Sequence, residues 1–92
     1  MRYRRYQHAY NNRGFAEMHL NMPDKARADI GKSLAMDSAN SYAWKNLGLL
    51  MLQLKKTDSA CLLFKKAQAL RYSEKYGSEV DSLIKVHCKY VN

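Results

Sequence analysis

The stretch that decides the fold is SYAWKNLGLLMLQLKKTDSACLLFKKAQALRYSE, residues 41–74. Its apolar residues recur at helical spacing in two blocks, and the polar run 55–58 separates the blocks. This pattern predicts two helices joined by a turn. The residues that mark the two buried faces are Trp44, Leu47, Gly48 and Met51 on the first helix and Ala60, Leu63, Phe64, Ala67 and Leu70 on the second.

The same pattern occurs once before, 34 residues earlier in the chain. The pairs that keep their chemical type at this separation are Tyr10/Trp44, Asn12/Asn46, Gly14/Gly48, Leu20/Leu54, Asp24/Asp58, Ala26/Ala60, Ile30/Phe64 and Lys32/Lys66, whereas Leu34/Gln68 does not. A fixed period of this length is typical of helical repeat proteins. It predicts a first helix pair in which Asn21 ends one helix and Pro23 and Asp24 begin the next.

Small residues hold the positions where the two helices of each pair would meet. These residues are Gly14 and Ala26 in the first unit and Gly48 and Ala60 in the second. We expect these residues to let antiparallel helices approach closely. Tyr10, Trp44 and Phe64, at the same spacing, are predicted to be core between the helices rather than a ligand box.

The tail predicts one amphipathic helix. Ser78 and Asp81 have the spacing of a capping box, and Lys85 and Lys89 lie near the expected helix end. The predicted buried face is Val80, Leu83, Ile84, His87 and Val91. Such a helix would close the open end of a repeat array. The expected organisation is one all-α domain of five helices, with an extension of the first helix at 1–6, repeats at 7–40 and 41–74, and a capping helix at 75–92.

A 34-residue helix pair with Trp44, Leu47, Gly48, Ala60, Phe64 and Ala67 in this order resembles the tetratricopeptide repeat. The second unit matches most of that signature, although Met51 and Tyr72 replace its usual tyrosine and proline. The first unit departs from it at Arg13, Glu17, Ser33 and Ser38. The resemblance covers nearly the whole chain, and the ending is similar to the caps of many bacterial proteins of this kind.

The resemblance implies an α-α superhelix, or solenoid, whose concave face is formed by the first helix of each repeat and binds a peptide or helix of a partner protein. The groove positions carried onto this chain are His8, Asn11, Asn12, Phe15, His19, Tyr42, Lys45, Asn46, Leu49 and Gln53. Asn12 and Asn46 stand where the family often keeps an asparagine that binds a peptide backbone. The family's carboxylate clamp is disfavoured, because Phe15 and Leu49 replace polar residues and no third repeat is present.

Sixteen Lys and Arg against eight Asp and Glu give a net charge of +8. This charge favours an acidic partner, or it is simply a solvated surface. Two cysteines, Cys61 and Cys88, do not make a disulfide framework, so we expect reduced thiols and a cytoplasmic location. No apolar run approaches the roughly 18 residues of a membrane span.

Several residues leave two interpretations open. Phe15, Tyr42 and Leu49 are either groove contacts or exposed apolar groups. His8 and His19 lack partners at metal-ligand spacing and are expected in solvent or in the groove. His87 and Cys88 are adjacent on a helix, so they point about 100° apart and do not form a catalytic pair.

The N-terminal start alternates Arg2, Arg4 and Arg5 with Tyr3 and Tyr6. This composition suits single-stranded nucleic acid, or the tyrosines form a stripe that shields the uncapped edge of the first helix. A basic nucleic-acid-binding repeat is the alternative function, but two units would read too few bases for specificity.

No motif indicates an enzyme, a metal site or a cofactor. Because about three repeats are usually needed for stability, we expect self-association through the N-terminal edge or a permanent partner.

Overall fold

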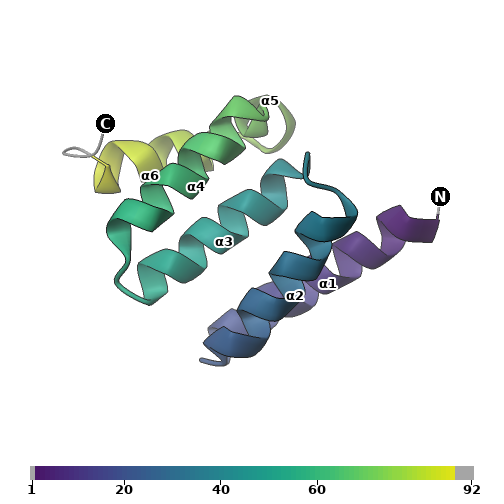
Figure 1. Ribbon diagram of the computed structural model, residues 1–92. Coiled ribbons are helices and arrows are strands. Elements are labelled where there is room, and N and C mark those ends of the chain that lie inside the picture. The colour runs from purple at the N-terminus through teal and green to yellow at the C-terminus, as the bar shows by residue number, and fades with distance from the viewer. Residues whose placement is uncertain (1, 89–92) are drawn as a thin grey trace.

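The structure is a computed structural model that describes residues 2–88, with side chains from Tyr6 onward. This part of the chain is all-α (Figure 1). Its six helices are α1 (Arg2–His19), α2 (Pro23–Met36), α3 (Ser41–Gln53), α4 (Thr57–Ala69), α5 (Tyr72–Tyr76) and α6 (Glu79–His87). The side chains of residues 2–5 and residues 89–92, which include the predicted tyrosine stripe at Tyr3 and the predicted positions of Lys89 and Val91, lie outside the described residues.

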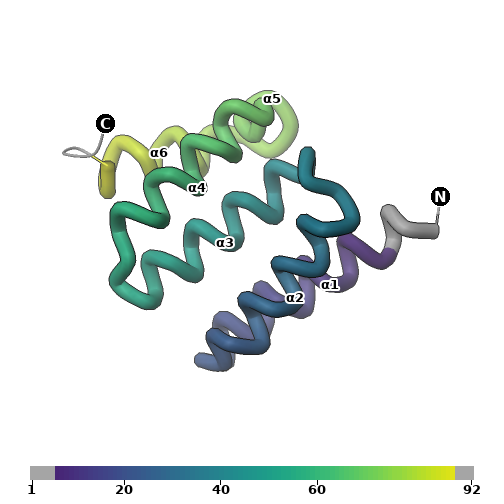
Figure 2. Tube along the Cα trace, in the orientation of Figure 1, coloured from purple at the N-terminus to yellow at the C-terminus, as the bar shows by residue number. Residues whose placement is uncertain are grey.

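The helices form two hairpins that follow one another along the chain (Figure 2). α1 packs on α2, α3 packs on α4, and α2 lies against α3, so each of these four helices mainly contacts its sequence neighbours. In the part of the chain that the structure describes, no helix is long and apolar enough to cross a membrane.

The turns of the two hairpins use the same backbone conformation. Asn21 after α1 and Lys55 after α3 both have positive φ, 59° and 61°. The prediction that Asn21 ends its helix in the left-handed region is therefore confirmed, and Pro23 begins α2 as expected. Asn40 begins α3, because its side-chain oxygen accepts hydrogen bonds from the backbone N–H groups of Tyr42 and Ala43.

Close packing inside each hairpin depends on one glycine. A Cβ atom on Gly14 would lie 2.6 Å from Cγ1 of Ile30, and one on Gly48 would lie 2.5 Å from Cε1 of Phe64. Both Ile30 and Phe64 are fully buried, as are Ala26 and Ala60. The prediction that these small residues permit close helix approach is confirmed, because any larger residue would push the helices apart.

The aromatic residues predicted as core divide into two groups. Phe64 is fully buried, whereas Tyr10 and Trp44 are only half-buried. Nε1 of Trp44 donates a hydrogen bond to the Ser38 carbonyl at 2.8 Å, and the Lys66 ammonium lies over the indole ring. Trp44 therefore covers the edge of the core with its polar end near water.

Three of the four departures of the first unit from the repeat pattern, Arg13, Glu17 and Ser33, take part in polar interactions between α1 and α2. Arg13 binds both oxygens of Asp29, at 2.6 and 2.7 Å. These hydrogen bonds hold the pKa of the Asp29 carboxyl below its usual range. Hydrogen bonding to the same carboxyl raises the pKa of Glu17. Ser33, another departure, donates a hydrogen bond to the buried Gln7 side chain.

The C-terminal region contains one more helix than expected. The expectation of five helices is wrong for the described residues, because a sixth helix, the short α5, lies between turns at Arg71 (φ 66°) and Gly77 (φ 104°). α6 then packs on α4 through the fully buried Val80. The predicted capping box is also wrong, since the Ser78 side chain makes no cap hydrogen bond.

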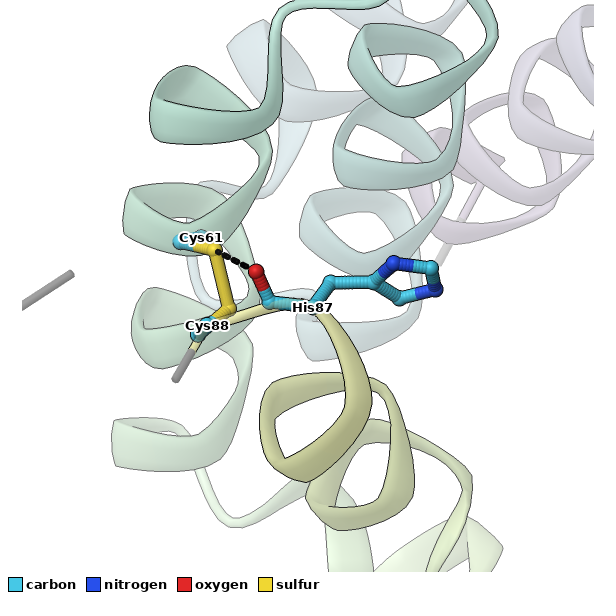
Figure 3. The surroundings of a disulfide bond; sticks show 3 residues. All are labelled: Cys61, His87 and Cys88. Atoms are coloured by element: carbon cyan, nitrogen blue, oxygen red, sulfur yellow. Dashed lines mark hydrogen bonds between the residues drawn. A yellow bond between two sulfur atoms is a disulfide. The ribbon is translucent and has the colours of Figure 1, made fainter. Parts of the chain in front are cut away.

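The expectation of two reduced thiols is wrong, because Cys61 on α4 and Cys88 after α6 form a disulfide (Figure 3). Their Cα atoms are 5.8 Å apart, within the range that a disulfide spans. No pattern in the sequence indicates this contact, since the cysteines are 27 residues apart and meet only when α6 docks on α4. The pairing removes the argument for a reducing compartment.

Candidate functional site

A pocket of about 380 Å³ opens between the first helices of the two hairpins. Three helices line it with the side chains of Phe15, Met18 and His19 from α1, Leu49 and Gln53 from α3, and Glu79 from α6. We call this set the groove pocket. Its volume falls at the lower end of the range for small-ligand sites, and its lining combines apolar surface with a few polar groups.

The α1 wall of the groove pocket is organised by an aromatic contact. The rings of Phe15 and His19, one helical turn apart, meet edge to face with centroids 4.4 Å apart. Across the pocket, Nε2 of Gln53 donates a hydrogen bond to the Met18 carbonyl at 2.9 Å. This bond joins α3 to α1, and it fixes the spacing of the two walls.

A buried lysine lies beside the groove pocket. The Lys45 side chain is only 3 % exposed, and its Nζ lies 3.5 Å from Oε1 of Glu79. The same ammonium lies 4.3 Å from the centre of the Tyr42 ring and 5.5 Å from that of Phe15. Burial lowers the pKa of Lys45, and the nearby Glu79 carboxylate opposes that shift.

Tyr72 holds the acidic partner of Lys45 in place. Its hydroxyl donates a 2.8 Å hydrogen bond to Oε1 of Glu79. Burial and this hydrogen bond raise the pKa of Tyr72, which therefore stays protonated at neutral pH. The Tyr72 ring also packs with those of Tyr42 and Tyr76. Glu79 is thus fixed at the rim by one neutral and one cationic donor.

The predicted groove residues occupy different environments. Four of them, Phe15, His19, Leu49 and Gln53, line the groove pocket. Asn11 and Asn46 instead lie in the interior, where Nδ2 of Asn46 donates to Oδ1 of Asn11 at 3.1 Å. That bond links α1 to α3.

The remaining predicted residues lie outside the groove pocket. Asn12 is exposed. His8 lines a separate hollow of about 200 Å³ together with Asn40 and Tyr76. Tyr42 packs on the tyrosines at the α5 end, with its ring 5.1 Å from that of Tyr76. Of the predicted groove residues, the structure therefore brings together those nearest the C-terminal ends of α1 and α3.

Two lining residues were absent from the sequence-derived set. Met18 follows Phe15 by one helical turn, and this spacing could have identified it. Glu79 belongs to α6, far along the chain, and reaches the pocket only through the packing of α6 on α4. No pattern in the sequence marks that contact.

Among the described residues, no three His, Cys, Asp or Glu side chains are grouped so that they could hold a metal ion. Comparison with protein-family models, with curated proteins and with solved structures found no match. The function therefore has to be argued from the groove pocket itself.

Proposed function

We propose that this chain is a non-catalytic protein-interaction module that binds a peptide or a helix of a partner protein in the groove pocket. In this proposal the two hairpins are the tetratricopeptide-like repeats of a short α-α superhelix, and the C-terminal helix closes it. The equivalent glycines of the two hairpins and their equivalent left-handed turns support that assignment.

The observation that carries the proposal is the composition of the groove pocket. Phe15 and Leu49 are half-buried apolar side chains on opposite walls, and Gln53 and His19 offer hydrogen-bonding groups beside them. Apolar and aromatic anchors surrounded by polar groups are typical of the centres of protein interfaces.

The disulfide weakens the expectation that an array of two repeats needs a partner or a second copy to fold. A cross-link between α4 and the end of α6 stabilises the closing helix without a third repeat. Binding in the groove pocket is thus proposed for the monomer, whether or not the chain also self-associates.

Selection from a displayed library of random peptides, followed by titration of the ¹⁵N-labelled protein with a selected synthetic peptide, tests the proposal. We expect the largest chemical-shift changes at residues of the groove pocket, and loss of binding in Leu49→Ala. Leu62→Ala is the matched control, because Leu62 is 64 % exposed on α4 and does not line the pocket. Failure to select any peptide, or shifts confined to another surface, would refute the proposal.

A further inference from the structure

The groove pocket is lined by a carboxylate, whose charge is opposite to that of the chain. The net charge of the whole chain is +8, yet Glu79 is the one formally charged residue among the described residues that line the pocket. A ligand held between Phe15 and Leu49 therefore meets a carboxylate at the rim.

The Glu79 carboxylate is exposed enough to bind a further cation. Lys45 and Tyr72 both contact Oε1 of Glu79. The Glu79 side chain is 51 % exposed even though it pairs with a buried lysine. A carboxylate can accept hydrogen bonds at both oxygens, and a cationic donor makes the stronger ones.

The buried lysine is poorly placed to receive an acidic ligand. Lys45 is 3 % exposed and is covered by the rings of Tyr42 and Phe15, with Glu79 already beside its ammonium. A ligand carboxylate would have to displace Glu79, and before doing so it would be repelled by that group.

We propose that the groove pocket selects a peptide segment in which a bulky apolar side chain stands next to a lysine or arginine. The apolar side chain packs on Phe15, Met18 and Leu49, and the cation pairs with Glu79. This inference rests on the proposed function. The net charge of the chain favours an acidic partner, whereas the groove pocket favours a basic peptide segment.

The test uses the same displayed library with the wild-type chain, Glu79→Gln and Glu74→Gln. Glu74→Gln removes the same charge from α5, where Glu74 is exposed and lies 3.9 Å from Arg71, away from the pocket lining. We expect wild type and Glu74→Gln to enrich apolar residues beside lysine or arginine, and Glu79→Gln to enrich the apolar residues without the basic neighbours.

A change in the ligand makes the test independent of whether Glu79→Gln folds. In a selected synthetic peptide, replacing the basic residue with glutamine should weaken binding to the wild-type chain about two- to fivefold, and replacing it with glutamate should weaken it more. Far-UV circular dichroism checks the fold of each variant.

The outcomes separate the two proposals. Selection of peptides with no basic preference, or with an acidic one, overturns this inference while peptide binding in the groove pocket stands. A basic preference that Glu79→Gln retains in full, in a folded protein, overturns it as well. Absence of any selected peptide defeats the proposed function first.

Discussion

Reduction of the disulfide should destabilise this protein strongly. The Cys61–Cys88 bond closes a loop with a sequence separation of 27, which restricts the unfolded chain. The chain-entropy relation gives about 3.5 kcal/mol for such a loop at 25 °C. For a domain of this size, that loss corresponds to a fall of about 15–20 °C in the melting temperature.

The structure indicates how the loss would be distributed. Without the bond, α6 is held by the buried Val80 and by the half-buried Leu83 and Ile84. The sulfur of Cys61 lies 3.7 Å from the carbonyl oxygen of His87 (Figure 3). A disulfide sulfur has no proton to donate, but a reduced Cys61 thiol would form a weak hydrogen bond there and recover a small part of the loss.

Urea unfolding followed by circular dichroism, with and without a phosphine reductant, measures the effect. Thiol titration should find no free thiol before reduction and two after it, and the amides of α6 should exchange with deuterium faster in the reduced chain. Cys61→Ser/Cys88→Ser is the control, since its stability should not respond to the reductant. Two free thiols in the air-oxidised protein, or a reductant-induced change below about 1 kcal/mol, would refute the reasoning.

Three further predictions concern the hairpins. Gly48→Ala should lower the free energy of unfolding by about 2 kcal/mol, because the added Cβ would overlap the Phe64 ring. Gly31→Ala should raise the free energy of unfolding by up to about 1 kcal/mol, because a Cβ at Gly31 would meet open space. Equal effects of the two substitutions in urea unfolding would contradict this reasoning. Asn40→Ala should cost about 1–2 kcal/mol through loss of the α3 cap and of the contact with Gln7, and the exposed Asn12→Ala should show no such loss in the same assay. Asp29→Asn should lower the urea midpoint at pH 7. Arg13 lowers the folded pKa of Asp29, so the ionised group stabilises the fold above its unfolded pKa, and this contribution disappears as the pH falls through the lower folded pKa. The difference between the two proteins should therefore shrink below about pH 4, and a gap that persists in acid would argue against this role for the charge.

The sequence by itself determined the helical class and the positions of the turns within and between the hairpins. Helix periodicity, Asn21, Pro23 and the glycine at each hairpin contact are local or near-local signals, because a helix buries one face whatever lies beyond it. The small residues at the hairpin contacts could be identified because they recur at the same separation, whereas their large partners, Ile30 and Phe64, were seen only in the structure. Of the ten groove residues that the family resemblance implies, four line the pocket.

Only the tertiary structure decided how the C-terminal helices are arranged and which residues they contact. The backbone at Arg71 and Gly77 separates the short α5 from α4 and α6, and the resulting direction of α6 brings Cys88 to Cys61 and Glu79 to Lys45. Both contacts join segments more than 25 residues apart and depend on how α6 docks, which periodicity does not encode. The burial of Asn11 against Asn46 likewise depends on how closely α1 approaches α3, and the sequence alone could not distinguish an interior amide pair from two amides open to a ligand.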